Sequence, residues 1–372
     1  SRQQPVTTRP ESSFPMNSAW LLAGARTPIG KFLGAFRGTP APALGAAAIR
    51  ASLDRAGIEP GEVDEVIMGN VVSAGLGQAP ARQAALMAGL PPTVAALTVN
   101  KVCGSGLKAV MLAAQAVRLG DAKIVVAGGM ENMTLAPHLA SGMRQGWKFG
   151  NATLEDSMIH DGLWCAFDDR HMGLHAEYTA REARLSREDL DRFSAESQQL
   201  AARAASEGAF DEEIVPVAVS AKTGTTEITR DEGPRPETTA EALARLKPAF
   251  DQEGCVTAGN SSMSSDCAAA LIVADRETTD ARLAPLRARI VASHTSGTEP
   301  RDLFFAPVAA VRGVLEKAGL RAEDIDLFEI NEAFASQMLA CLREPRPDPN
   351  TVHGKGGAIA PAHRIGDSGA CL

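Results

Sequence analysis

Two copies of one sequence pattern occur in the chain, 262 residues apart. Residues 48–68 read AIRASLDRAGIEPGEVDEVIM, and residues 310–330 read AVRGVLEKAGLRAEDIDLFEI. Each copy has the apolar spacing of a helix, an Ala-Gly pair where the helix ends, an acidic turn, and an apolar segment typical of a strand. This repetition predicts a core built from two related halves.

Strand-like and helix-like segments alternate around the first copy. The apolar segments that predict strands are 19–24, 65–69, 123–129 and 268–274, and those that predict helices are 44–56, 80–88 and 107–117. The 45% hydrophobic content, with 34 glycines and 4% aromatic residues, suits a tightly packed core of small side chains. The chain is therefore expected to be an α/β protein with a layered, mixed or parallel sheet.

The composition of the sequence changes between residues 136 and 250. This region contains interspersed His, Trp, Met and Arg residues and one predicted amphipathic helix at about 187–206. We interpret this region as an inserted loop domain that lies over the core. The expected division is an N-terminal core half at 17–135 completed by 251–283, the loop domain at 136–250, a C-terminal core half at 284–372, and a disordered, proline-containing tail at 1–16.

Charge and cysteine usage narrow the possible partners. The net charge is −8 and no segment is strongly basic, so nucleic-acid binding has little electrostatic support. The six cysteines are widely spaced without a C-x-x-C pair, which argues against a zinc site or a dense disulfide framework and favours a reducing, cytoplasmic location. No apolar run approaches the ~18 residues of a membrane span. We therefore expect no nucleic-acid, membrane or metal partner.

Cys103 lies between a strand-like segment and the helix predicted at 107–117. Free backbone N–H groups and the positive end of a helix dipole favour a thiolate at such a turn. Gly104 and Gly106 allow another backbone or a substrate to come close. The segment alone is equally compatible with an inert buried cysteine.

Three other segments bear on this choice: 258–262, 329–335 with Asn331, and 356–363 with His363. By the repeat, Asn331 and His363 belong to the half that faces Cys103. A cysteine beside a histidine that an amide orients is the arrangement of an activated nucleophile for acyl transfer.

Together these segments resemble the thiolase family, from about Asn17 to the last residue. Cys103-Gly-Ser-Gly106 is similar to the acyl-accepting cysteine turn of that family, Asn331-Glu-Ala-Phe334 to a family signature, and Gly356-Gly-Ala-Ile-Ala followed by His363 to the catalytic-histidine segment. The resemblance implies a thiolase-like duplicated βαβαβ core in α/β/α/β/α layers.

It also implies the Claisen condensation of two acetyl-CoA molecules to acetoacetyl-CoA and CoA, or the thiolytic reverse. Cys103 would carry the acyl group, His363 would assist its deprotonation and stabilise the enolate oxygen, and Asn331 would hold a water in the same oxyanion site. Coenzyme A would be a substrate, and no covalently bound cofactor is implied.

By the same likeness, seven residues would contact coenzyme A: Leu163, His171, Met172, Arg235, Phe250, Ser262 and Phe334. Arg235 would face the negative charge of the nucleotide, and the loop with His171 and Met172 favours a short acyl chain. The family likeness also predicts a homodimer or a homotetramer.

Two expectations concern the end of the sequence. The strand at 123–129 should recur near 385–391, so the C-terminal half is expected to lack its last helix and strand. The second catalytic cysteine of the family, in a Cys-x-Gly-Gly-Gly turn, would also lie beyond residue 372. The 372-residue chain is therefore expected to form an acyl-enzyme without completing the condensation.

Two alternatives stay open. A catalytically impaired, thiolase-like protein that binds acyl-CoA or serves as an interaction subunit is motivated by Ala362-His363-Arg364, which replaces the usual Gly-His-Pro, and by changes at Cys267 and Leu303-Phe304-Phe305. A dinucleotide-dependent oxidoreductase fits the α/β texture, but no G-x-G-x-x-G follows the first strand.

Overall fold

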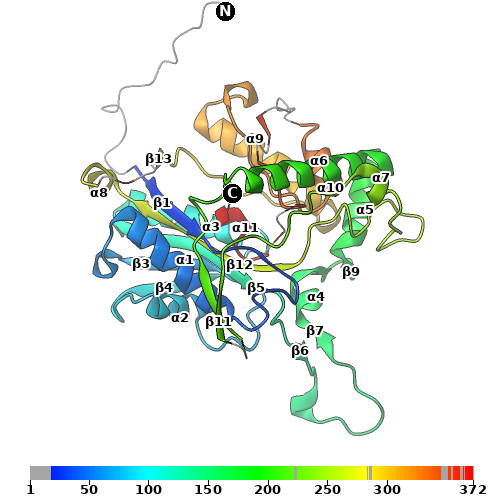
Figure 1. Cartoon of the computed structure of the whole chain (residues 1–372), viewed down its shortest axis with the longest axis horizontal. Coiled ribbons are helices and arrows are strands. Elements are labelled where there is room, and N and C mark those ends of the chain that lie inside the picture. Colours follow the sequence, from blue (N-terminus) through cyan, green and yellow to red (C-terminus); the bar gives the residue numbers. More distant parts are fainter. Residues whose placement is uncertain are drawn as a thin grey trace, which may run out of the picture.

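A mixed β-sheet with helices on both faces forms the centre of the computed structural model (Figure 1). The structure describes residues 18–221, 224–282, 284, 287–344, 351–352, 355–360, 363 and 365–371. The tail expected at 1–16 lies outside these residues. The α/β class expected from the alternating pattern is confirmed.

The strands of the sheet run in the order β13-β1-β12-β5-β3-β4, and β2 pairs with β12. Their bounds are β1 Trp20–Arg26, β2 Gly30–Lys31, β3 Glu65–Gly69, β4 Ala95–Val99, β5 Ile124–Asn132, β12 Ser265–Ala274 and β13 Ala288–Arg289. Strand β3 is parallel to β4 and β5, with Gly69 opposite Val99 and Gly129. The carboxyl ends of these three strands therefore meet at one edge, and the chain leaves β4 there toward Cys103.

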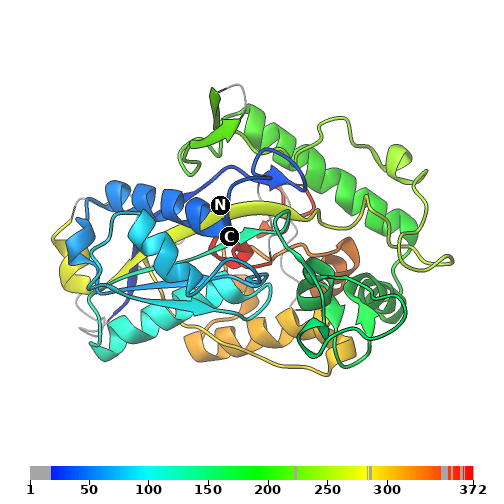
Figure 2. The same cartoon turned by 90° about the horizontal axis from the view of Figure 1, so that it is seen from below.

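Alternation along the strands divides the core between two helical layers (Figure 2). Helices α1 (Ala41–Ala56) and α2 (Pro80–Met87) pack with Val66 and Met68 of β3 in one apolar cluster. Ile67 points to the opposite face and packs with α3 (Ser105–Leu119) in a second cluster. Period-two alternation in β3 thus builds both sides of the sheet.

The repeated sequence pattern appears as repeated structure. Helix α1 ends at Gly57 (φ 62°), and α9 (Ala306–Ala318) ends at Gly319 (φ 66°), both in the left-handed conformation that glycine adopts readily. A 3-10 helix follows each of them at the same offset, η2 at Pro60–Glu62 and η5 at Ala322–Asp324.

The strand that ends each copy differs between the halves. In the first half, β3 pairs along its length with two strands. In the described part of the second half, segment 326–330 makes one bridge, Phe328 to Val352, with the Phe328 N–H donating to the Thr351 carbonyl at 2.7 Å. The described residues thus contain the helix and the turn of the second copy. Of the strand pairing seen in the first copy, they show a single bridge.

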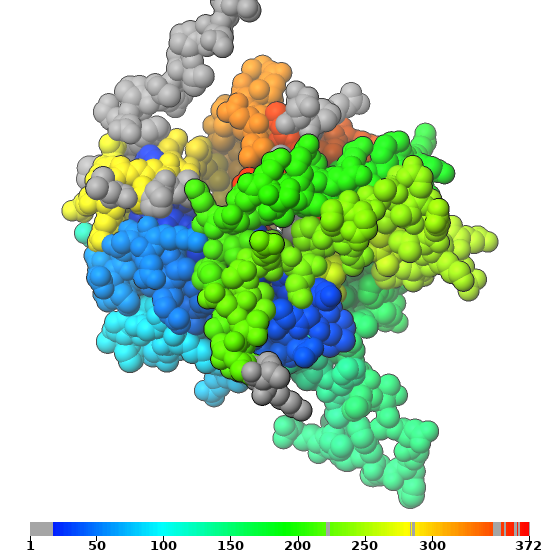
Figure 3. Space-filling model, in the orientation of Figure 1, coloured from blue at the N-terminus to red at the C-terminus, as the bar shows by residue number. Residues whose placement is uncertain are grey.

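The region at 136–250 consists of short hairpins and two longer helices. Its elements are β6 His138–Leu139, η3 Met143–Gln145, β7 Glu155–Asp156, α4 Ser157–Gly162, β8 Trp164–Cys165, β9 Arg170–His171, α5 Met172–Glu182, α6 Arg187–Ser206, β10 Val217–Ala221, β11 Gly224–Ile228 and α7 Ala240–Leu243. The segment between β6 and β7 protrudes from the body (Figure 3). Helix α6 begins after the N-cap Ser186, whose hydroxyl accepts from the Asp189 N–H.

Four short elements complete the description: α8 Arg276–Asp280, η4 Pro300–Phe305, α10 Ala335–Cys341 and α11 Ser368–Cys371. Helices α5 and α6 pack against α10, so the 136–250 region covers the C-terminal part of the chain. The boundaries expected for the core halves and the loop domain stay a prediction.

One segment differs from the expectation that no run resembles a membrane span. The segment Val102–Leu119, which includes α3, is 18 residues long and has a mean hydropathy of 1.2. By length and composition alone it could span a membrane. Core helices of globular proteins meet the same criterion, and α3 buries Ala109, Ala113 and Val117 in a core cluster.

Candidate active site

Cys103 lies on a tight turn between β4 and α3. The preceding residue, Val102, has φ 47°, a left-handed conformation that is strained for a β-branched side chain. Ser105 holds the turn, because its hydroxyl donates to the Val102 carbonyl at 2.6 Å and accepts from the Lys101 N–H at 2.8 Å. The strain is thus kept in place beside the candidate nucleophile.

His363 faces Cys103 across the two halves of the chain. Its Nε2 lies 3.0 Å from Cys103 Sγ, and its Nδ1 lies 2.9 Å from the hydroxyl of Ser368 at the start of α11. The His363 backbone N–H donates to the Met263 carbonyl at 3.1 Å, just before β12. The imidazole is buried, and contacts of the ring nitrogens and a hydrogen bond of the His363 backbone fix its position. Ser368 was not among the candidates, although Ser368-Gly369 follows the histidine segment.

Asn331 lies on the far side of the imidazole from Cys103. Its Nδ2 is 3.1 Å from His363 Nδ1, and its Oδ1 is buried with no hydrogen-bond partner among the residues that the structure describes. The oxygen and nitrogen of the amide can be exchanged, which places Oδ1 where it accepts from His363 Nδ1–H and moves Nδ2 to the position without a described partner. In that orientation Nδ1 carries the proton, and Nε2 is free to accept the proton of the Cys103 thiol.

The protonation of Cys103 differs from the expectation. Burial raises the pKa of its thiol to about 12, and the nearby Glu131 carboxyl adds to the rise, while a hydrogen bond from its own backbone N–H acts in the opposite direction. Desolvation therefore outweighs the backbone hydrogen bond to the sulfur. Cys103 is a neutral thiol that needs a base, and His363 Nε2 is the base within reach.

Glu131 is a buried acid that none of the sequence motifs contains. Its carboxyl oxygens accept from the Val71 N–H at 3.0 Å, the Val72 N–H at 3.2 Å and the Asn70 amide at 2.9 Å. Burial raises its pKa to about 8, and repulsion from Asp367 and Asp266 adds to this. It holds the loop after β3 against Cys103, since Val71, Val72 and Cys103 share one apolar cluster. An acidic residue in the apolar strand 124–132 was the available sequence signal.

Four of the seven coenzyme A candidates gather in one apolar cluster with an aromatic row. His171 stacks on Phe250 with ring centroids 4.9 Å apart, and Phe250 meets Phe334 edge-on at 6.3 Å. Met172 packs against the same cluster. Burial lowers the pKa of His171, and its Nδ1 accepts from the Gly173 N–H at 3.0 Å, which fits a neutral ring that caps α5.

The other three candidates lie in different surroundings. Leu163 packs in the apolar cluster that contains Cys103. The Ser262 hydroxyl donates to the Ala333 carbonyl at 2.7 Å, next to Phe334. Arg235 is exposed, and its backbone N–H donates to Gln198 Oε1 at 2.8 Å.

The structure describes some of the positions whose residues differ from the family pattern and suggested a catalytically impaired protein. Phe304 is buried and meets Phe334 edge-on at 5.3 Å, so it extends the aromatic row. Cys267 is buried, with Thr27 Oγ1 at 3.4 Å from its Sγ. Ala362 and Arg364 lie outside the described residues.

Comparison with known proteins adds to this geometry. The chain is 51% identical over 355 residues to an acetyl-CoA acetyltransferase of Pseudomonas aeruginosa, and 48% identical over 356 residues to one of Cupriavidus necator. Each alignment covers 95% of this chain and 90% of the relative. The crystal structure of the Bacillus anthracis acetyl-CoA acetyltransferase superposes with a TM-score of 0.93 at 36% identity, covering 96% of this chain and 90% of that one.

Two family matches account for most of the sequence. Residues 20–277 match the thiolase N-terminal domain, and residues 284–372 match the thiolase C-terminal domain. Together with the relatives and the shared fold, these matches show that the chain belongs to the thiolase family.

Proposed function

We propose that the chain is an acetyl-CoA acetyltransferase, which condenses two acetyl-CoA molecules to acetoacetyl-CoA and CoA, or runs the thiolytic reverse, through an acetyl-Cys103 intermediate. The observation that carries this proposal is the 3.0 Å approach of His363 Nε2 to Cys103 Sγ. Thiolase membership makes the chain an acyltransferase, and the names of its relatives supply the substrate class.

In the first half-reaction, His363 Nε2 takes the proton of Cys103 as Sγ attacks the thioester carbonyl of acetyl-CoA. A bond forms between Sγ and the acetyl carbon, the bond from that carbon to the CoA sulfur breaks, and the departing CoA thiolate takes a proton from solvent while His363 Nε2 keeps the proton of Cys103. The raised pKa of Cys103 makes this general-base step necessary near neutral pH.

In the second half-reaction, a thiolate base, which the family likeness assigns to a second cysteine, would remove an α-proton from another acetyl-CoA. The enolate carbon then bonds to the acetyl carbon as the bond from that carbon to Cys103 Sγ breaks, and Sγ takes its proton back from His363 Nε2. His363 Nε2 would donate a hydrogen bond to the enolate oxygen, with Asn331 supporting the same oxyanion site. Asn331 already touches the imidazole at 3.1 Å, so any change in its side chain alters the proton position on His363 as well.

The aromatic row would receive the pantetheine arm. Phe334, Phe250 and His171 offer apolar ring faces, and Met172 extends that surface. Arg235 supplies an exposed cation for the nucleotide phosphates.

A homodimer or homotetramer in the cytoplasm is part of the same proposal. Within the described sheet, β4 is an edge strand, and its Leu97 is 44% exposed. An open strand edge with exposed apolar side chains is a surface that a second copy would cover.

Intact-mass measurement after incubation with acetyl-CoA tests the proposal. We expect one added acetyl group on the wild-type chain and none on Cys103→Ala. Cys255→Ala is the matched control, because Cys255 is another half-buried free cysteine, and this variant should keep the adduct. An adduct that survives Cys103→Ala, or no adduct on the wild type at any pH, would refute the role of Cys103.

A further inference from the structure

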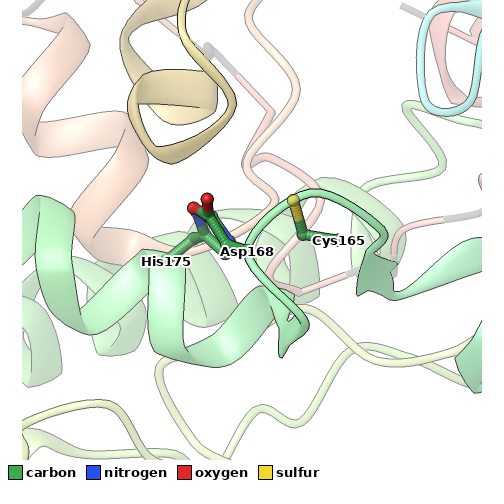
Figure 4. Close-up of side chains that lie close together, drawn as sticks. All are labelled: Cys165, Asp168 and His175. Carbon is green, nitrogen blue, oxygen red and sulfur yellow. The ribbon is translucent and has the colours of Figure 1, made fainter.

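A second group of reactive side chains lies away from Cys103 (Figure 4). Cys165 ends β8, Asp168 follows on the turn of the β8–β9 hairpin, and His175 lies in the first turn of α5. The cysteine sulfur, a carboxylate oxygen and a ring nitrogen all lie within 4.8 Å of one another. Figure 4 shows the three side chains projecting to the same side of the backbone.

His175 points a free ring nitrogen into this group. The side chain is 3% exposed, and its Nε2 has no hydrogen-bond partner in the described part of the chain. The nearest carboxylate oxygen, Asp168 Oδ2, is 3.7 Å away, beyond hydrogen-bond distance. A buried polar atom in this state is costly unless something binds it.

The other ring nitrogen fixes the direction of the lone pair. His175 Nδ1 lies 3.5 Å from the carbonyl of Arg301. A proton on Nδ1 then points at this carbonyl and leaves the Nε2 lone pair facing Cys165 and Asp168. Histidines that bind metal ions are held in this way, with the second ring N–H donated to a carbonyl or carboxylate.

We propose that Cys165 Sγ, Asp168 and His175 Nε2 bind one Zn²⁺ ion. A thiolate, an imidazole and a carboxylate together suit zinc, whereas Mg²⁺ and Ca²⁺ prefer oxygen ligands alone. On binding, the Cys165 thiol loses its proton to solvent, and the thiolate and carboxylate supply two negative charges for the ion.

The surroundings allow the ligands to close on an ion. Zinc ligands lie about 2.0–2.3 Å from the metal, so their atoms must come closer than 4.8 Å. Asp168 lies on an exposed turn beside Asp169, which is left-handed at φ 50°, so closing on an ion would require a shift of surface residues and not of the core. A cavity of about 330 Å³ lined by Asp168, His175 and Tyr178 offers a fourth position to water.

A bound ion would tie the hairpin to α5. Trp164 of β8 pairs with His171 of β9, and His171 stacks on Phe250 in the aromatic row. A bound zinc ion would therefore hold His171 in place. The effect of this on coenzyme A binding rests on the proposed function, but zinc binding itself does not depend on that function.

The test measures metal binding by the full chain in the Cys103→Ala background, which removes the rival thiol beside His363. Zn²⁺ affinity is measured by competition with a chromophoric chelator, and Co²⁺ is used as a spectroscopic probe of the ligands. We expect one equivalent of Zn²⁺, a thiolate-to-cobalt charge-transfer band, and a loss of affinity of more than about 100-fold in Cys165→Ser and in His175→Gln.

Two further variants make the result decisive. Asp168 is exposed, so we expect Asp168→Asn to leave the fold intact and to weaken the same site. Cys371→Ser is the matched control, because Cys371 lies in a comparable group with Cys267 and Asp367, and it should leave the affinity unchanged. Unchanged affinity in the three site variants, loss of affinity in Cys371→Ser, or cobalt spectra without the thiolate band would overturn the proposal. Acetylation of Cys103 in the wild-type chain is measured separately, so either proposal can fail alone.

Discussion

At the residue scale, acyl transfer depends on how the proton is shared between Cys103 and His363. Cys103 is half-buried in an apolar cluster near Glu131, so desolvation raises the pKa of its thiol to about 12 and disfavours the thiolate near neutral pH. A histidine nitrogen at 3.0 Å can take the proton during attack. The pair therefore works as a nucleophile with a general base, not as a preformed thiolate and imidazolium.

This assignment predicts how Cys103 reacts with iodoacetamide. Alkylation requires the thiolate, so its rate at Cys103 should increase continuously as pH is raised from 7 to 10, because this whole range lies below the pKa of about 12. Peptide mass spectrometry resolves Cys103 from the other cysteines. A rate that is already constant above about pH 6.5, the ordinary pKa of histidine, would show a preformed ion pair and contradict the assignment.

At the element scale, the site is built where the first turns of α3 and α11 meet. A Cβ atom placed on Gly106 would lie 3.0 Å from the backbone N of Ala370 and O of Asp367, and one on Gly369 would lie 2.7 Å from Leu107 Cβ. Small residues at both positions thus allow α11 to bring Ser368 to His363. The C-terminal part of the chain thus contributes the surroundings of His363 through this close contact.

Gly106→Ala tests that contact. The added methyl group meets backbone atoms, so we expect a loss of about 1–3 kcal/mol in the free energy of unfolding, measured by urea denaturation, together with slower acetylation. Gly61→Ala is the control, since a Cβ there meets nothing within 4 Å, and its stability should change by less than about 1 kcal/mol. Equal stability of the two variants would show that the close approach is unimportant.

Elements that depend on local sequence were predictable, and interactions that depend on tertiary burial were not. The strand at 65–69 and the helix at 187–206 were predicted with the bounds they have, because apolar period and capping residues determine them locally. The raised pKa of Cys103 was missed because burial by Val72 and Ile365 comes from distant segments. The group around His175 was missed because the cysteine spacing gives no sign of it. The roles of His363 and Asn331 stay predictions.

At the scale of the whole molecule, Glu131 links stability to pH. Its folded pKa of about 8 lies above the ordinary value of 4.5, so the folded protein keeps a proton that the unfolded chain releases. Between these values, raising the pH favours the unfolded state, and below about 4.5 the contribution is fully present.

The free energy of unfolding should therefore fall as pH rises from about 5 to 8, by at most about 5 kcal/mol at 1.36 kcal/mol per pKa unit. Denaturant titrations at several pH values measure this slope. Glu131→Gln should flatten it, whereas Glu196→Gln, on an exposed position of α6, should not. An identical slope in the wild type and Glu131→Gln would remove Glu131 as its cause.

The fold brings together a nucleophile and a base that lie 260 residues apart in the chain. The most direct measurement is the single-turnover rate of Cys103 acetylation by acetyl-CoA, in the wild type and in His363→Gln, from pH 7 to pH 10. At pH 7 we predict a rate about 10²–10⁴-fold lower in His363→Gln. The deficit should shrink as pH rises, because hydroxide then removes the thiol proton without the histidine. Equal rates at pH 7, or a deficit that does not change with pH, would contradict His363 as the base for Cys103.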